Sequence, residues 1–173
     1  MEIRDAVEQD IQRVTEIYNE VLTTSTAIYS DQPAKLEERI AWWKSRQQQG
    51  YPVLIAVDEG AIIGFATFGD FRAWPGYRFT VEGTIHIHSS SRSRGVGTAL
   101  LEKLIERARA AGKHSLMAGV DSENVASLQF LKRSGFEQVG YLPEVGFKFD
   151  RFLDLVFLLY RLTPSATRTG DDS

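Results

Sequence analysis

The sequence predicts an α/β (α+β) domain in which a mixed, mostly antiparallel central sheet carries helices on both faces. Three observations support this fold class. Two helical stretches open the chain, three strand-like runs follow one another directly, and helical and strand-like runs then alternate. Strands in direct succession pair antiparallel, whereas a strand–helix–strand unit gives a parallel crossover. The predicted order of elements is ααβββαβαββ.

The first two elements are predicted to be helices. Apolar residues three and four positions apart indicate an amphipathic helix over residues 7–22. A second helix is expected within residues 31–50, with Asp31 as a candidate cap, Pro33 near its start and Gly50 at its end. We expect this helix to bury an apolar side and to present a solvated face made of Lys35, Glu37, Glu38 and Arg39.

The remaining runs supply the sheet and two further helices. The segment "YPVLIAVDEGAIIGFATFGDF" predicts two strands joined by a hairpin at "DEGA", and "RFTVEGTIHIH" predicts a third. A helix over residues 95–111, the strand "HSLMAGV", the helix "ENVASLQFLKRSG" and the strand "FEQVGYL" follow. The segment "FKFDRFLDLVFLLYRL" closes the domain with one or more strands. We expect residues 1–162 to form a single domain and residues 163–173 to form a disordered tail.

Composition narrows the functional classes. The 173 residues are 43% hydrophobic and 25% charged, which suits one domain with a proper core. A net charge of −3 gives no overall attraction to nucleic acid. The chain has no cysteine, so disulfides, thiolate metal sites and a cysteine nucleophile are excluded. Because no apolar run is long enough to cross a bilayer and the N-terminus lacks an apolar signal core, we expect a cytoplasmic protein without a membrane partner.

The stretch "RSRGVGT" at residues 92–98 lies between a strand ending near His88 and a helix beginning near Gly95. A helix N-terminus offers free N–H groups and a positive dipole end, so this junction predicts an anion site, with phosphate as the natural guest. A Gly-x-Gly pair also serves ordinary turns, and that alternative stays open. A P-loop is excluded because Gly97 is followed by Thr98 and Ala99, and a dinucleotide fingerprint would need a third glycine at Leu100.

The pattern Arg92-x-x-Gly95-x-Gly97 resembles the acetyl-CoA signature of the GNAT acyltransferases, and "ENVASLQFLKRSGF" resembles their second signature. The resemblance implies the GNAT fold and acetyl-CoA as co-substrate. It implies that Asn124 binds the pantetheine arm and that the strand containing Glu82 pairs with the same arm. The backbone groups that it assigns to acetyl-CoA belong to Ile85, His86, Ile87, Ser93, Arg94, Gly95, Val96, Gly97 and Thr98.

The segments "FRAWPGYRFTVEGTIHIH" and "KFDRFLDL" resemble the phosphinothricin / methionine sulfoximine N-acetyltransferase branch of that family. This resemblance implies a cytoplasmic homodimer that acetylates the α-amine of small amino-acid analogues. Asp150 and Phe152 depart from the branch, which carries Gly and Trp there. The resemblance places the acceptor pocket at Arg72, Ala73, Trp74, Glu82, Gly83 and Thr84, and "TAIYS" at residues 26–30 is a candidate for its other wall.

Glu82 is the predicted catalytic base. Strand alternation places it on one sheet face together with Thr84, His86 and His88. Burying a carboxylate in a sheet costs free energy unless it is paired or hydrogen-bonded, so its presence there indicates a function. Desolvation can raise its pKa into the range in which it takes a proton from an ammonium. The alternative is a surface glutamate paired with Arg72 or Arg78. Without a cysteine or a Gly-x-Ser-x-Gly motif, direct attack within a ternary complex is the simplest scheme.

Other features bear on the acceptor and on rival functions. Arg72 and Arg78 are candidates for binding an acceptor carboxylate, although an exposed loop arginine remains the alternative. His86 and His88 lie two positions apart on one strand face, but without a third ligand they do not predict a metal site. Leu131 stands where many GNAT enzymes place a tyrosine acid. The rival functions are acetylation of a protein or peptide N-terminus or another small amine, and a non-catalytic CoA-binding regulatory module.

Overall fold

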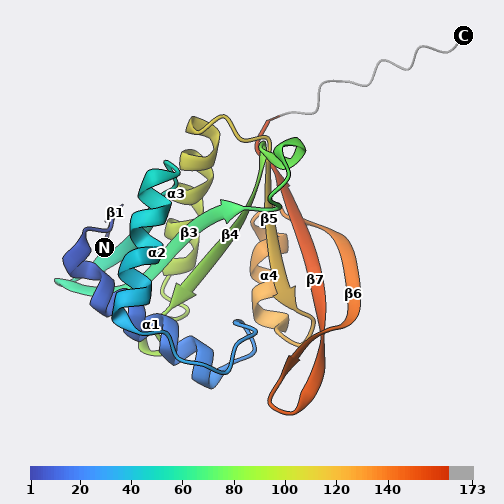
Figure 1. The fold of residues 1–173 in the computed structure, drawn as a ribbon, viewed down its shortest axis with the longest axis horizontal. Coiled ribbons are helices and arrows are strands. Elements are labelled where there is room, and N and C mark those ends of the chain that lie inside the picture. Colours follow the sequence, from blue (N-terminus) through green and yellow to red (C-terminus); the bar gives the residue numbers. More distant parts are fainter. Residues whose placement is uncertain (164–173) are drawn as a thin grey trace, which may run out of the picture.

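One seven-stranded sheet, with the strand order β1-β2-β3-β4-β5-β7-β6, forms the centre of the protein. The computed structural model describes residues 1–163, so the predicted tail lies outside the described residues except for Thr163. Figure 1 shows helices on both sides of the sheet. The elements in chain order are β1 (Glu2–Asp5), α1 (Ile11–Thr24), α2 (Leu36–Gln48), β2 (Val53–Asp58), β3 (Ala61–Asp70), β4 (Thr80–Ile87), α3 (Val96–Ala110), β5 (Ser115–Asp121), α4 (Val125–Arg133), β6 (Glu137–Lys148) and β7 (Arg151–Arg161).

Two apolar clusters hold the helices against the sheet. On one face, Leu100 and Leu104 of α3 and Leu131 of α4 pack with buried residues of β2, β3, β4 and β5. On the other face, α1 and α2 pack over β2 and β3, with Ile17 and Phe65 among the buried residues. Alternate residues of a strand point to opposite faces of the sheet, so the same strands contribute to both clusters. The two clusters confirm the prediction of a sheet covered by helices on both sides.

The strands β4 and β5 form the parallel pair of an otherwise antiparallel sheet, and they pair over a short stretch only. Residues 80–82 of β4 match residues 115–117 of β5, and the register ends there. By contrast, β3 and β4 pair over residues 64–70 and 81–87. Figure 1 shows β4 and β5 diverging beyond their paired ends. The sheet is therefore split along the lower part of β4.

The predicted order of helices and strands is confirmed, with two differences at the sheet edges. The structure adds β1, a strand of 4 residues that pairs with β2 and was not predicted. Its sequence "EIRD" is too short and polar to show an alternating pattern. The strand predicted at "FEQVGYL" continues to Lys148 through a bulge after Leu142. There Glu144 adopts a positive φ, and its N–H donates to the Asp154 carboxylate at 2.8 Å.

The second helix also differs from its prediction. It begins at Leu36, five residues after the proposed cap Asp31, and the Glu38 carboxylate accepts a hydrogen bond from the Lys35 N–H at 3.0 Å. Arg39 is buried rather than solvated, because its guanidinium stacks 3.8 Å from the Trp42 ring centroid and 4.3 Å from that of Tyr18. The charged pattern predicted a solvated face, but cation–π stacking places this arginine inside.

Candidate active site

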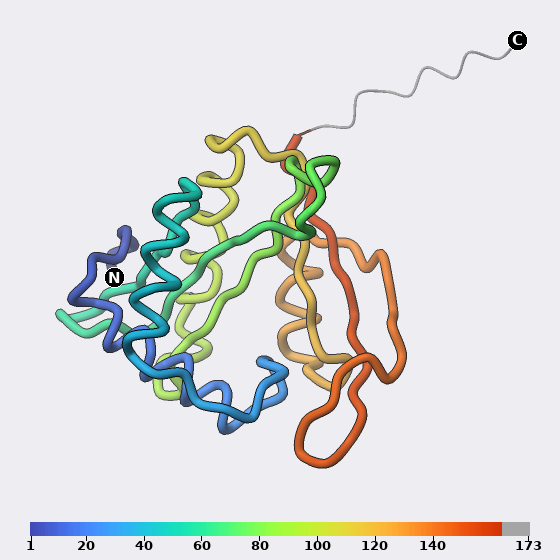
Figure 2. Tube along the Cα trace, in the orientation of Figure 1, coloured from blue at the N-terminus to red at the C-terminus, as the bar shows by residue number. Residues whose placement is uncertain are grey.

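A cleft of about 780 Å³ occupies the split between β4 and β5. Its walls come from both diverging strands, from the start of α3, from α4 and from the loop that follows α1. Figure 2 shows this loop, in blue, crossing in front of the split before the chain returns to α2. Of the predicted site residues, the lining includes Gly83, Thr84, Ile85, His86, Ile87, Ser93, Gly95, Gly97, Thr98 and Asn124.

The N-terminus of α3 presents backbone donors at the cleft. The first hydrogen bond of α3 runs from the Ala99 N–H to the Gly95 carbonyl at 3.1 Å, so the N–H groups of residues 96–98 precede the helical ladder. Gly95 caps the helix with φ of 79°, a left-handed conformation that favours glycine. A Cβ on Gly97 would lie 3.3 Å from Ile87 Cδ1. The two glycines thus have different roles. Gly95 allows the left-handed turn before the helix, and Gly97 allows α3 to pack closely against Ile87.

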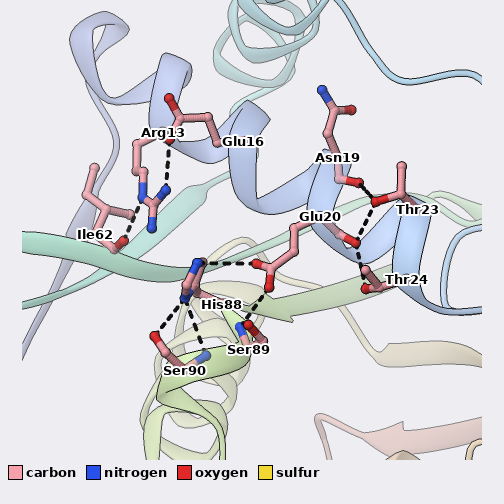
Figure 3. Close-up of polar contacts among 10 residues, drawn as sticks. All are labelled: Arg13, Glu16, Asn19, Glu20, Thr23, Thr24, Ile62, His88, Ser89 and Ser90. Carbon is pink, nitrogen blue, oxygen red and sulfur yellow. Dashed lines mark hydrogen bonds and ion pairs between the residues drawn. The ribbon is translucent and has the colours of Figure 1, made fainter.

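The loop before α3 is fixed from two sides. On one side, Glu20 of α1 accepts a hydrogen bond from the Ser89 N–H at 3.3 Å and lies 3.5 Å from the His88 ring, as Figure 3 shows. Burial acts to raise the pKa of Glu20, but the Ser89 hydrogen bonds and the nearby His88 and Arg92 outweigh it and lower that pKa. On the other side, Arg94 pairs with Asp58 at 2.8 Å.

The positive side chains of this loop are therefore divided. Arg92 lines the cleft, whereas Arg94 is turned toward the β2–β3 hairpin by its ion pair with Asp58. Val96 is 2% exposed, and its side chain belongs to the α3 core cluster. Arg94 and Val96 do not line the cleft, so their side chains do not contribute to the predicted anion site.

Glu82 lies where β4 separates from β5, in the last paired position opposite Met117. A Cβ added to Gly119 would come 3.0 Å from Glu82 Oε1, so the glycine leaves room for the carboxylate. Burial raises the pKa of Glu82, and the positive charge of Arg72 acts in the opposite direction. The ion pairs formed among residues 1–163 do not include Glu82. A half-buried carboxylate with a raised pKa suits proton transfer.

The β3–β4 loop is exposed, and the structure separates its two arginines. Arg72 lies near enough to Glu82 for its charge to act on that carboxylate, and its guanidinium is 5.2 Å from the Phe71 ring centroid. Arg78 instead lies over the Phe79 ring and donates to the Pro75 carbonyl at 3.1 Å. Arg72 and Ala73 are exposed and Trp74 is 76% exposed, and these three residues, like Glu82, are not among those that line the cleft.

The other predicted positions lie along the same cleft. Asn124 caps α4, because its side-chain oxygen accepts from the Ser127 N–H at 3.2 Å, and its amide group can still donate. Leu131 lines the wall, so this position offers no hydroxyl to a leaving group. The His86 ring lies 5.3 Å from that of Phe65, and burial, with Arg39 nearby, lowers the pKa of His86 to about 4.

Sequence reasoning missed the β5 side of the cleft, but it offered "TAIYS" at residues 26–30 as a candidate wall, and Thr26 and Ala27 of that segment lie at the cleft. Ser25, Thr26 and Ala27 line it from the loop after α1, and the Thr26 hydroxyl donates to the carboxylate of Asp121, which is 2% exposed. The segment carries small polar residues without periodicity, so the sequence gives little signal for it. The small residues of "MAGVD" in β5 are the signal that could have indicated a strand facing a ligand.

Comparison with known proteins identifies the family. Residues 11–136 match the family described as Acetyltransferase (GNAT) family. The chain belongs to the GNAT acetyltransferases. An L-methionine sulfoximine/L-methionine sulfone acetyltransferase of Pseudomonas paraeruginosa is 43% identical over 164 residues, covering 94% of this chain and 95% of the relative. A phosphinothricin N-acetyltransferase of Streptomyces coelicolor is 32% identical over 160 residues, covering 91% and 94%.

A solved structure gives the same result for the fold. An acetyltransferase from Salmonella typhimurium, determined with acetyl-CoA, has a TM-score of 0.92 and 40% identity, and the match covers 95% of each chain. The predicted GNAT fold and the predicted branch are thus confirmed. In residues 1–163, no helix combines the length and apolar character that crossing a membrane requires.

His86 should make stability depend on pH. Its pKa is about 4 in the folded protein, below the ordinary value of about 6.5, so between these values the unfolded chain binds more protons. Stability should therefore fall as pH drops from 7 to 5, with about 2 kcal/mol of that loss due to His86. Urea unfolding of wild type and His86→Asn at both pH values measures this. Equal losses in the two proteins would contradict the prediction.

Proposed function

We propose that this GNAT protein transfers an acetyl group from acetyl-CoA to the α-amine of a small amino-acid analogue by direct attack in a ternary complex. The observation that carries the proposal is one cleft with free backbone donors of α3 at one end and the half-buried Glu82 carboxylate beside the other. The named relatives support methionine sulfoximine, methionine sulfone and phosphinothricin as acceptors.

The residues around the cleft fit acetyl-CoA. The N–H groups of residues 93–98 suit its pyrophosphate, because a helix N-terminus favours negative charge. Beyond Glu82, the edge of β4 that faces β5 has no strand partner, so backbone groups of residues 83–87 are available to the amides of the pantetheine arm. The amide group of Asn124 would add a donor on the opposite wall.

Glu82 has the proton-transfer role. An α-ammonium attacks a thioester only after it loses a proton, and a carboxylate whose pKa is raised by burial accepts that proton directly or through one water. The neutral amine then attacks the acetyl carbonyl, and a β4 N–H stabilises the negative charge that develops on the carbonyl oxygen. The leaving group is a CoA thiolate, whose conjugate acid has a pKa near that of a free thiol. The reaction therefore does not require an acid at the position of Leu131, where many GNAT enzymes carry a tyrosine.

Arg72 has the acceptor-binding role. Its guanidinium is a bidentate partner for a carboxylate, and its charge already acts on Glu82. A peptide N-terminus lacks the free α-carboxylate that Arg72 would bind, which favours an amino acid over a peptide. The catalytic arrangement around Glu82 likewise favours an enzyme over a regulatory module. The homodimer and the cytoplasmic location implied by the resemblance stay predictions.

Thiol release from acetyl-CoA tests the function directly. We expect rapid turnover with methionine sulfoximine, methionine sulfone and phosphinothricin, and slow or no turnover with polyamines and short peptides. Ordinary amino acids measure how far the side chain matters. Turnover confined to peptides or polyamines would remove the proposed acceptor class, and acetyl-CoA binding without turnover on any amine would favour the regulatory module.

Replacing Glu82 by glutamine should lower kcat by roughly 10²–10⁴-fold, because the general base is lost while the side-chain shape is kept. The affinity for acetyl-CoA, measured by calorimetry, should stay within twofold, since the α3 donors are untouched. Glu102→Gln, at an exposed position of α3, is the matched control and should behave as wild type. Unchanged kcat in Glu82→Gln would end the assignment of the base.

Replacing Arg72 by glutamine should raise the acceptor KM by about 10–100-fold, as expected when a charge-assisted hydrogen-bond pair is lost. The KM for acetyl-CoA should not change. Arg78→Gln is the matched control, because Arg78 lies in the same loop but is directed to Phe79 and the Pro75 carbonyl. Steady-state kinetics with each substrate varied in turn measures both values. A larger effect at Arg78 than at Arg72 would reverse the assignment.

A further inference from the structure

Lys148 is a buried lysine at the end of β6, and the mechanism above does not use it. It is 1% exposed, and its ammonium donates to the carbonyls of Leu22, Ser25 and Ile28, the last two at 2.7 Å. These carbonyls belong to the last turn of α1 and to the segment at residues 25–30 that follows it. The hairpin of β6 and β7 is thus joined to the loop after α1, which lines the cleft.

The chemistry of lysine suits this contact. An ammonium has three donors, and here they meet three carbonyl acceptors. The C-terminal end of α1 carries partial negative charge, which favours a cation. The ion pairs formed among residues 1–163 do not include Lys148, so its partners are neutral backbone groups. A buried charge held in this way fixes the position of a segment that has no helix or strand of its own.

Further contacts bind the same segment to the strands beyond the split. The Thr26 hydroxyl donates to the Asp121 carboxylate of β5. The Tyr29 hydroxyl is 3.4 Å from the Asp154 carbonyl of β7. The Tyr29 ring lies so close to β6 that a Cβ on Gly146 would overlap it. Residues 25–30 are thus attached to β5, β6 and β7, all on the far side of the split from β4.

The segment lies next to the position of the proposed chemistry. Asp121, which holds Thr26, is two residues from Gly119 in β5, and Gly119 is the residue that leaves room for Glu82. Residues two apart in a strand share a face and lie about 7 Å from each other. Ser25, Thr26 and Ala27 line the cleft, and Thr26 contacts Asp121 one side-chain row along β5 from Gly119, the glycine next to the Glu82 carboxylate.

We propose that Lys148 is a positioning residue for acceptor binding, whose ammonium fixes residues 25–30 as the outer wall of the acceptor pocket beside Glu82. The inference rests on the proposed function, because the wall matters only where an acceptor binds. The polar contacts of the segment run to the β5–β7 side and not to residues 92–98. Loss of Lys148 should therefore affect the acceptor and leave acetyl-CoA binding intact.

The test uses Lys148→Met, which keeps the length of the side chain and removes its donors. We expect the acceptor KM to rise by about tenfold or more, with a smaller change in kcat and with acetyl-CoA affinity within twofold of wild type, because hydrogen bonds that order the wall are lost. Hydrogen exchange should become at least about tenfold faster at amides 25–30 and stay unchanged in β2 and β3. Lys132→Met, at an exposed position of α4, is the matched control.

Thr26→Val removes a different anchor of the same segment and covers the case in which Lys148→Met fails to fold. It should raise the acceptor KM in the same direction, again without an effect on acetyl-CoA affinity. An unchanged acceptor KM in a variant with wild-type exchange at residues 25–30 would overturn the positioning role. If wild type acetylates none of the amines, the proposed function fails and the acceptor role fails with it, whereas the exchange measurement still reports whether Lys148 anchors the segment.

Discussion

The early end of the pairing between β4 and β5 is the constraint on which the rest of the site depends. After Glu82 and Met117 the two strands diverge, and the backbone of β4 loses its partner on one edge. Unpaired backbone groups in a protein interior require a substitute, and in this protein they line a cleft rather than a core. The same divergence brings the start of α3, the cap of α4 and the loop after α1 to a common space. Their arrangement follows from one interrupted ladder.

Three glycines adapt the protein to that cleft by the absence of a side chain. A Cβ on Gly83 would meet Leu116 at 3.0 Å, one on Gly97 would meet Ile87 at 3.3 Å, and one on Gly119 would meet the Glu82 carboxylate at 3.0 Å. Each contact is tighter than an ordinary van der Waals contact, so a larger residue would force the walls apart. Gly97 and Gly119 keep the walls close beside the free donors of α3 and beside the Glu82 carboxylate.

Much of the fold was readable from the sequence because its elements are periodic and of ordinary length. The glycine loop that opens α3 at the cleft was also predictable, since two glycines at a strand–helix junction have a local physical meaning, while its binding of an anion stays a prediction. The short strand β1 and the bulge in β6 carry no local pattern, because β2 and Asp154 supply what stabilises them. Arg39 and Lys148 were missed for the same reason. Arg39 stacks on Tyr18 of another helix as well as on its neighbour Trp42, and Lys148 is held by carbonyls more than a hundred residues away. A local sequence window does not contain Tyr18 or those carbonyls.

Two opposing influences act on one carboxylate in the proposed acceptor pocket. Burial raises the pKa of Glu82, and the charge of Arg72 lowers it. In the proposed function an acceptor carboxylate binds Arg72 and neutralises most of that charge at the distance of Glu82. The opposing influence then weakens while burial increases, because the acceptor displaces water. Both changes act to raise the pKa of Glu82, and they oppose the positive charge of the arriving ammonium, which acts to lower it. Arg72 would thereby connect recognition of the α-carboxylate with activation of the α-amine.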